Sequence, residues 1–263
     1  MDAVPQRRER VASLVAGRGF ARVVDLAREL RVSEVTVRTD LAALETEGRI
    51  TRVHGGAMPR SVVAERESSL EQSRTKLARA KAAIAERAAA RVRSGQSIVL
   101  DVGSTTLAVA QALVARTDLD ELVVVTNGLA VALALEPGIP RFTVVVTGGT
   151  LRPLQHSLVD PLASPMLEGL RVDLAIVGAT GVHADHGITN VNLPEADVKR
   201  RIVASASESI LVADGSKLGQ AHLGLVAPLG AIGELITDAA APTDQVDALR
   251  ATGLRVTLVR PRS

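Results

Sequence analysis

Short apolar segments alternate with helical segments from residue 97 to the C-terminal end of the chain. The apolar segments are residues 97–100, 122–125, 142–146, 174–177, 210–212, 234–236 and 256–259. Such runs are typical of strands that are buried on both faces of a parallel sheet, and the helices between them supply the crossovers. The pattern predicts an α/β main domain, an open and mostly parallel sheet with helices on both faces.

The beginning of the chain follows a different pattern. Apolar residues recur at helical spacing around residues 11–15, 23–30 and 37–44, which predicts three short helices. Residues 49–53 then alternate between polar and apolar side chains and lead into a Gly-Gly turn, which predicts a hairpin. Three helices followed by a hairpin predict a small N-terminal winged helix-turn-helix domain.

Changes in composition mark the domain borders. Residues 58–73 mix Pro, Ser and charged side chains without any period, which is typical of a linker. An alanine-rich stretch over residues 74–93 predicts a helix. We therefore expect the winged domain over residues 1–58, a linker over 59–76 and the α/β domain over 77–263.

Charge and aromatic content indicate which class of partner the winged domain binds. Residues 1–60 hold 11 Arg against 8 Asp and Glu, so the positive charge lies at the front of the chain. The chain has two Phe, no Tyr and no Trp, which excludes the aromatic platforms that stack on single-stranded nucleic acid. We expect double-stranded DNA as the partner. The alternative is a three-helix module that contacts other proteins and has a solvated charged face.

The helix that follows Ser33 begins with a polar face. In a helix-turn-helix, the second helix of the motif enters the major groove with its first turn, where Arg pairs with guanine and Thr meets a thymine methyl. Cations of the hairpin reach phosphate, and its glycines allow close backbone approach. Asp40 would repel phosphate, so we expect it to orient an Arg, such as Arg38 or Arg52, or to cap a neighbouring element. The predicted DNA-binding residues are Ser33, Glu34, Thr36, Arg38, Thr39, Arg49, Arg52, His54, Gly55 and Gly56.

The segment from Ser33 to Ala57 reads SEVTVRTDLAALETEGRITRVHGGA. It resembles the N-terminal signature of the DeoR family of bacterial transcription regulators, and the resemblance implies DNA binding through this helix and the wing. The family's usual Arg-Arg-Asp-Leu stands here as Arg38-Thr39-Asp40-Leu41. The resemblance therefore implies that Thr39 removes one phosphate contact.

Polar loops follow several of the predicted strands. Residues 101–106 come directly after the first strand and open a helix, whose N-terminal N–H groups suit an anion. Comparable loops are residues 126–128, 147–150, 178–181 and 214–217. Loops at the carboxyl ends of parallel strands converge on a crevice, so we expect an anionic ligand there, although the first loop alone is also consistent with an ordinary helix cap. Glu195 and Lys199 share one helix face, either as a surface ion pair or pointing into the crevice.

Other kinds of site are not predicted. The chain has no cysteine, which excludes thiolate metal sites and cysteine nucleophiles. It has no Walker motif, dinucleotide fingerprint or nucleophile elbow. His183 and His186 flank Asp185, but this spacing suits a polar loop. We therefore expect no metal and no cofactor. We also expect no membrane partner and a cytoplasmic location, because no apolar run reaches the length of a membrane span and the N-terminus lacks a secretory signal.

Residues 97–238 resemble the DeoR C-terminal sensor domain, whose fold is like that of ribose-5-phosphate isomerase. The matching stretches are LDVGSTT, VVTNG, VTGGTLR, GATGVHADHGITNVNLPEADVK and LVADGSK. The resemblance implies that a phosphorylated sugar binds as the effector. The residues it implies are Asp101, Gly103, Ser104, Thr105, Thr106, Asn127, Gly149, Glu195, Lys199 and Lys217. Asp160 stands where the family usually has Gly, and we expect it to add a carboxylate near the crevice.

Together these features predict a DNA-binding repressor of a carbohydrate-use operon whose affinity for DNA is changed by a sugar phosphate. A homo-oligomer, dimer or tetramer, is expected. The alternative is a sugar-phosphate isomerase-like enzyme with a DNA-binding appendage, in which Glu195 acts as the base. Against it, the strand end where such isomerases are acidic reads Gly178-Ala179-Thr180-Gly181, and their usual Lys has no clear counterpart. We therefore expect no enzyme activity.

Overall fold

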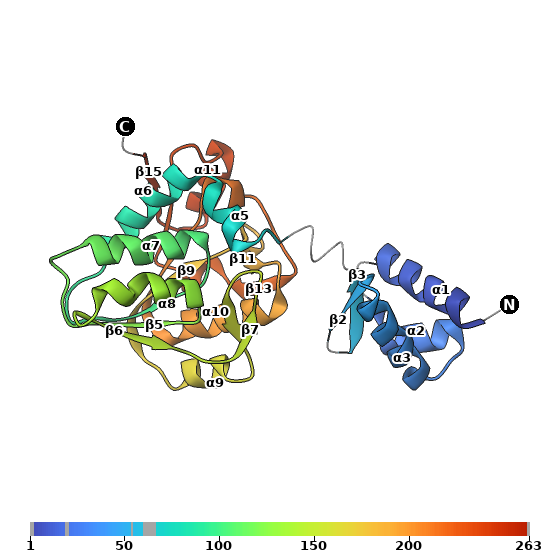
Figure 1. Ribbon diagram of the computed structural model, residues 1–263. Coiled ribbons are helices and arrows are strands. Elements are labelled where there is room, and N and C mark those ends of the chain that lie inside the picture. The colour runs from blue at the N-terminus through green and yellow to red at the C-terminus, as the bar shows by residue number, and fades with distance from the viewer. Residues whose placement is uncertain (1–2, 19–20, 54, 60–66, 262–263) are drawn as a thin grey trace. The chain divides into compact units, whose positions relative to one another are not determined.

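The computed structural model describes residues 3–18, 21–53, 55–59 and 67–261. It divides into two compact units, residues 1–68 and 69–263 (Figure 1). Helix α5 (Leu70–Thr75) opens the second unit and lies inside the range that the sequence assigns to the linker. Each unit has its own buried apolar core.

The first unit contains the predicted helices and hairpin. Its elements are α1 (Ala3–Arg18), β1 (Ala21–Arg22), α2 (Val23–Leu30), α3 (Glu34–Thr46), β2 (Ile50–Val53) and β3 (Gly56–Pro59). The two-residue strand β1 pairs with β3 and makes the wing a sheet of order β1-β3-β2. No periodicity could predict β1, because two residues are too few to show one. The prediction of a winged helix-turn-helix is confirmed.

The turn between α2 and α3 follows from two local features. Arg31 ends α2 in the left-handed region, at φ +56°. Ser33 then caps α3 by accepting a hydrogen bond from the Thr36 N–H at 3.1 Å. This short connection lets Leu26 of α2 and Leu41 of α3 bury their side chains in one core.

The second unit is built on a seven-stranded sheet of order β15-β14-β12-β9-β4-β5-β6, and all its pairs are parallel. Its strands are β4 (Ser97–Leu100), β5 (Leu122–Thr126), β6 (Phe142–Val146), β9 (Val172–Gly178), β12 (Ala206–Val212), β14 (Glu234–Asp238) and β15 (Val256–Val259). Every predicted apolar segment lies in one of these strands. The prediction of an open parallel sheet is confirmed.

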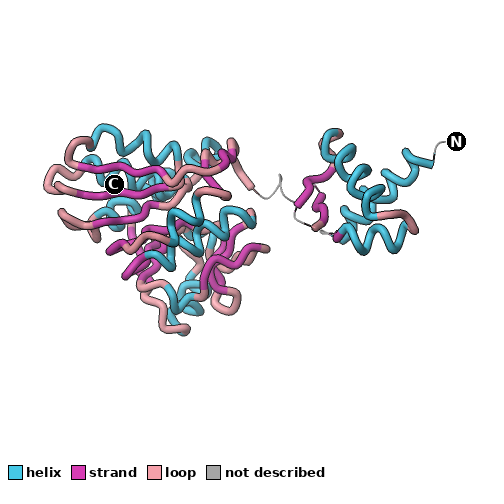
Figure 2. Tube along the Cα trace, turned by 90° about the horizontal axis from the view of Figure 1, so that it is seen from below, coloured by secondary structure: helices cyan, strands magenta, loops and turns pink. Residues whose placement is uncertain are grey.

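The central strands lie between two helical layers (Figures 1 and 2). Their alternate side chains pack against one layer or the other. Leu100 and Ile176 pack with the first layer, and Val99 and Val177 pack with the second. The first layer consists of α6 (Ala78–Ala89), α7 (Ser104–Ala115) and α8 (Leu129–Leu135). The second consists of α9 (Ala163–Glu168) and α10 (Leu193–Ser205). Burial on both faces explains why these strands have no polar alternation.

Several short elements surround the main sheet. Helix α11 (Thr243–Ala251) packs beside β15. The small strands are β7 (Thr150–Arg152) with β8 (Ser157–Val159), and β10 (Gly181–His183) with β11 (Gly187–Asn190) and β13 (Gly224–Ala227). The single-turn helices are η1 (Glu136–Gly138), η2 (Gly215–Lys217) and η3 (Leu229–Ala231). These short strands could not be predicted, because none of them is a continuous apolar run.

The prediction of one helix over residues 74–93 is wrong. The chain breaks between α5 and α6, where Leu77 adopts a left-handed φ of +52°. The buried Lys81 ammonium donates hydrogen bonds to the Ser73 and Lys76 carbonyls, at 2.5 and 2.8 Å. These bonds satisfy carbonyls that a continuous helix would use internally, and thereby stabilise the break.

None of the helices in the described ranges combines the length and the apolar character that a bilayer crossing requires.

Candidate effector site and nucleic-acid interface

The strand order places a switch point between β4 and β9. From β4 the chain continues to β5 and β6 on one side of the sheet, and then to β9, β12, β14 and β15 on the other. In open α/β sheets, ligands bind beyond the carboxyl ends of the strands at such a point, because the flanking loops diverge there.

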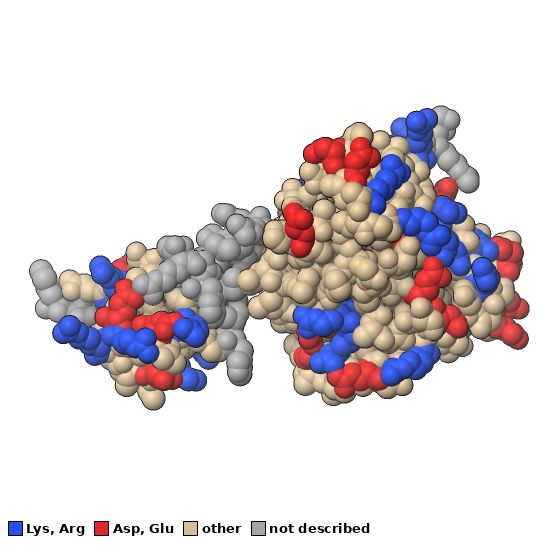
Figure 3. Space-filling model, turned by 180° about the vertical axis from the view of Figure 1, so that it is seen from behind, with Lys and Arg blue, Asp and Glu red and all other residues tan. Residues whose placement is uncertain are grey.

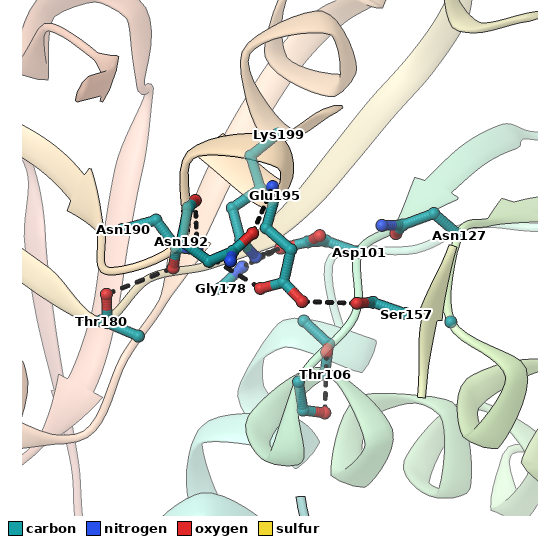
Figure 4. A network of polar contacts seen from close by, with 12 residues as sticks. Asp101, Thr106, Asn127, Ser157, Gly178, Thr180, Asn190, Asn192, Glu195 and Lys199 are labelled. Atoms are coloured by element: carbon teal, nitrogen blue, oxygen red, sulfur yellow. Dashed lines mark hydrogen bonds and ion pairs between the residues drawn. The ribbon is translucent and has the colours of Figure 1, made fainter. Parts of the chain in front are cut away.

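Asp101 connects the two sides of this switch point (Figure 4). It follows β4, and its Oδ2 accepts a hydrogen bond at 2.9 Å from the N–H of Gly178, which ends β9. The same oxygen forms an ion pair with the Lys199 ammonium of α10. Asp101 has the same strand parity as Val99, so its side chain points to the layer that contains α10. Of the two alternatives for Lys199, a surface ion pair or an inward side chain, the structure shows the inward side chain.

Asp101 and the neighbouring Asn127 each keep one unused acceptor. Asp101 follows β4 and Asn127 follows β5, and both are fully buried. Neither Asp101 Oδ1 nor Asn127 Oδ1 has a hydrogen-bond partner among the residues that the structure describes. Burial raises the pKa of the Asp101 carboxyl, and the nearby Lys199 ammonium only partly offsets this. Two adjacent acceptors without donors are suited to a ligand that brings hydroxyl groups.

Glu195 anchors a second part of the same network, in the first turn of α10 (Figure 4). Its Oε1 accepts from the Ser157 hydroxyl at 2.5 Å and pairs with the Arg152 guanidinium. Its Oε2 accepts from the Asn190 amide at 3.3 Å. Asn192 caps the helix by accepting from the Glu195 N–H at 3.1 Å. The Glu195 carboxylate therefore joins α10, the β7–β8 hairpin and β11.

The loop after Asp101 opens helix α7. Gly103 has a φ of +140° at the helix N-cap, a conformation that favours glycine. The Thr106 hydroxyl donates to the Gly103 carbonyl at 3.0 Å, and Thr105 and Thr106 are buried. Gly103 and Ser104 are half-buried. Helix α7 thus begins shortly after Asp101 in the chain, and the N–H groups at a helix N-terminus suit an anion.

The remaining predicted effector residues lie on separate elements. Gly149 precedes β7 with a φ of +121°, and a Cβ there would lie 2.1 Å from the Val159 carbonyl oxygen, so only glycine fits. Lys217 is half-buried in η2, beyond the end of β12. Asp160 is exposed, and its Oδ1 accepts from the Ser164 N–H of α9 at 3.0 Å. Its carboxylate thus stabilises the first turn of α9.

His183 and His186 are the pair that could imitate a metal site. The rings of His183 and His186 lie 4.7 Å apart. Within the described ranges, no group of three or more His, Cys, Asp and Glu side chains is arranged to hold a metal ion.

Helix α3 presents its predicted polar face to solvent. Arg38 is exposed and pairs with Glu34 at 3.1 Å, one turn earlier. The Thr39 hydroxyl donates to the Val35 carbonyl at 3.0 Å, so its donor is used within the helix. The Ser33 and Thr36 hydroxyls lie 2.8 Å apart at the helix cap.

Asp40 orients arginines, as expected, but these are not the suggested Arg38 and Arg52. Asp40 is buried, and its carboxylate accepts from the Arg7 Nε at 2.5 Å and the Arg8 Nε at 3.3 Å, both on α1. Burial by itself would raise the pKa of Asp40, but the hydrogen bonds from the two arginines lower it overall. This carboxylate therefore fastens α3 to α1 and not to the wing.

The wing carries arginines that are already paired with acidic residues. The Arg49 guanidinium donates two hydrogen bonds to the Glu9 carboxylate of α1, at 2.5 and 2.8 Å. The Arg52 guanidinium lies 4.0 Å from the Glu45 carboxylate. Gly55 is exposed with a φ of +77° and open space around it, as a turn tip requires.

Gly56 and His54 are the other wing residues that the sequence predicts to bind DNA. Gly56 is buried, and strands on both sides pair with it. His54 lies outside the described residues. Figure 3 shows Arg and acidic side chains interleaved on one face of this unit.

Sequence reasoning missed the Glu195 partners Arg152, Ser157 and Asn190. Arg152 and Ser157 belong to the β7–β8 hairpin, which has too few residues to be predicted. The only local indication was that Arg152 stands two positions after the glycine-rich loop of residues 147–150.

Comparison with known proteins agrees with this architecture. Residues 7–61 match the DeoR-like helix-turn-helix domain, and residues 76–239 match the DeoR C-terminal sensor domain. The chain is 34% identical to the HTH-type transcriptional regulator GlpR of Haloferax volcanii, over 95% of this chain and 96% of that protein.

Two further relatives are named as repressors. A putative aga operon transcriptional repressor of Escherichia coli O157:H7 is 31% identical, over 97% of this chain and 93% of that one. The lactose phosphotransferase system repressor of Streptococcus mutans is 31% identical, over 89% and 91%. These relatives favour a regulator over the enzyme alternative. The chain belongs to the DeoR family of transcriptional regulators.

Proposed function

We propose that this DeoR-family protein represses a carbohydrate-use operon and that a phosphorylated sugar changes its affinity for operator DNA. In this proposal, residues 1–58 bind duplex DNA, residues 59–76 connect the two domains and residues 77–263 sense the sugar. The observation that carries the proposal is the buried Asp101–Lys199 pair at the switch point, next to the N-terminus of α7.

The chemistry of the residues beyond the carboxyl ends of β4 and β5 supports a phosphorylated polyhydroxy ligand. The first N–H groups of α7, after Gly103, suit a phosphate. The unused acceptors Asp101 Oδ1 and Asn127 Oδ1 suit hydroxyl donors. The Glu195 carboxylate and Lys199 ammonium are buried and held by fixed partners, so they are positioned before a ligand arrives. A phosphate group and hydroxyl groups on one molecule are the features of a sugar phosphate.

The exposed face of α3 supports the DNA-binding role. Arg38 lies on the first turns of the helix, where a helix-turn-helix meets base edges. Ser33, Glu34, Thr36 and Thr39 share this end of the helix. Arg49 and Arg52 of the wing, together with Gly55, are placed for phosphate contact, and each arginine would exchange its acidic partner for phosphate.

Lys81 offers a route from the sensor to the connection. Its ammonium lies 3.7 Å from Asp214, in the loop after β12 that also carries Lys217. The same ammonium holds the break between α5 and α6, at the beginning of the sensor unit. A ligand that draws Lys217 toward the crevice would change this loop, and the Lys81 bonds would pass the change to α5. A coupling of about 1–3 kcal/mol would alter DNA affinity about 5- to 150-fold.

The proposed function implies a cellular location and an oligomeric state. A protein that acts on promoter DNA with a metabolic sugar phosphate works in the cytoplasm. A two-fold homo-oligomer would read palindromic half-sites, as a dimer or within a tetramer.

The test measures DNA affinity with and without ligand. A labelled duplex from the region upstream of the protein's own gene is titrated with intact protein by fluorescence anisotropy, at several salt concentrations. Ribose 5-phosphate, fructose 6-phosphate and glucosamine 6-phosphate are compared with inorganic phosphate. We expect salt-dependent binding and a shift of about fivefold or more with one sugar phosphate.

Two variants separate the halves of the proposal. Glu195→Gln is expected to bind DNA normally and to lose the sugar response. Arg38→Ala is expected to bind DNA more weakly and to keep its thermal stabilisation by the sugar. Absence of salt-dependent binding to the duplex, or a DNA affinity that no sugar phosphate changes, would refute the proposal.

A further inference from the structure

Val35 is the most exposed large apolar side chain in the part of the chain that the structure describes, at 72% exposure. It stands at the second position of α3, directly after Glu34. Scattered exposed apolar residues are ordinary on protein surfaces. Val35 differs because valine is a poor helix former, and here it gains no packing in return.

The side chains around Val35 define a small methyl-bearing surface. Residues three and four positions apart on a helix are neighbours, so Val35 lies beside Arg38 and Thr39. The Thr39 O–H donates to the Val35 carbonyl, which leaves the Thr39 methyl, and not a free donor, for an outside partner. The Glu34–Arg38 ion pair flanks this surface. The opposite face of α3 is buried through Val37.

We propose that Val35 is a specificity-determining residue that contacts the C5-methyl group of a thymine in the major groove. The inference rests on the proposed DNA interface of α3. In the major groove, thymine is the only standard base that presents a methyl group, and apolar side chains read it by contact. The first turn of a recognition helix is the part that lies closest to the base edges. A β-branched side chain there buries two methyl groups that water otherwise surrounds.

The experiment removes the methyl group from the DNA and the side chain from the protein. Intact wild-type protein first selects tight-binding duplexes from a random-sequence pool. Each thymine of a selected duplex is then replaced singly by deoxyuridine, which lacks only the C5-methyl. Dissociation constants are measured by fluorescence anisotropy for wild type, Val35→Ala and Val24→Ala. Val24 is the matched control, because it is an exposed valine on α2, outside the helix proposed to read bases.

We expect one thymine position at which deoxyuridine weakens wild-type binding about fourfold, the factor for losing contact with one methyl group. Val35→Ala should bind the parent duplex more weakly by a similar factor and show no further loss at that position. Val24→Ala should keep the wild-type pattern. Alanine is the better helix former, so Val35→Ala is expected to fold.

The outcomes separate this inference from the function it rests on. If Val35→Ala keeps the full sensitivity to deoxyuridine, or if no thymine position is sensitive in wild type, the role of Val35 is refuted. In that case a loss of affinity in Arg38→Ala would leave the DNA interface standing. If wild type selects no duplex at all, both the interface and the role of Val35 are refuted.

Discussion

Replacing Lys199 by methionine tests whether the buried ion pair supports the sensor unit. The Lys199 and Asp101 side chains are 4% and 0% exposed. Without the ammonium, the Asp101 carboxylate keeps the Gly178 N–H as its one hydrogen-bond partner among the described residues. Breaking a buried pair in this way costs about 3–5 kcal/mol, because one charge is left buried and uncompensated. For a unit of this size, that corresponds to a fall in Tm of about 6–20 °C.

The stability of the Lys199→Met variant should depend on pH in a direction that follows from the pKa of Asp101. Burial already raises the pKa of Asp101, and loss of Lys199 removes the main group that opposes this. The folded variant then holds a proton that the unfolded chain releases above its ordinary pKa of about 3.9. Stability of the variant therefore falls as the pH rises from about 4 through the raised pKa. The deficit relative to wild type should be larger at pH 8 than at pH 5.

The assay is thermal unfolding by circular dichroism and calorimetry, since a chain without Trp or Tyr gives little intrinsic fluorescence. The control is Asp101→Asn with Lys199→Met, which removes both charges and keeps an acceptor for the Gly178 N–H. This double variant should recover most of the lost stability. A deficit below about 1 kcal/mol in Lys199→Met, independent of pH, would refute the reasoning.

Three further predictions concern other parts of the molecule. Gly149→Ala should distort the base of the β7–β8 hairpin, because its Cβ would lie 2.1 Å from the Val159 carbonyl oxygen. Gly95→Ala, which meets no atom within 4 Å, should cost only the left-handed penalty of about 1–2 kcal/mol, and equal melting temperatures for the two variants would contradict this. Asp40 has a lowered pKa in the folded state, so its stabilisation is present above the ordinary pKa of about 3.9 and is lost as the pH falls. Asp40→Asn should melt earlier at pH 7 and show a weaker loss in acid, and an unchanged acid profile would exclude this role. Lys81→Met should keep sugar binding by calorimetry and reduce the effect of sugar on DNA affinity, whereas undiminished coupling would exclude the proposed route.

Local patterns in the sequence were sufficient for the strands of the main sheet, the three N-terminal helices and the fold class. The strands of the main sheet are apolar runs, of which the central ones are buried on both faces, and such runs are visible within three to five residues. The beginning of α3 is equally local, because Ser33 caps the helix through a residue three positions later. Strand β1 and the β7–β8 hairpin were not predicted, because these short segments are strands only through their pairing with other segments.

Which residues meet was decided by the tertiary structure. Asp101 and Lys199 are separated by 98 positions, and only the strand order and the packing of α10 bring them together. Arg152 and Glu195 meet because the β7–β8 hairpin lies over the first turn of α10. Asp40 could pair with several arginines, and the packing of α3 against α1 selects Arg7 and Arg8. The sequence alone determines which segments are apolar, helical or turn-forming, since these are short-range properties. The pairing of buried charges depends on long-range packing, because a carboxylate that leaves water is stabilised by whichever donors the fold brings within reach.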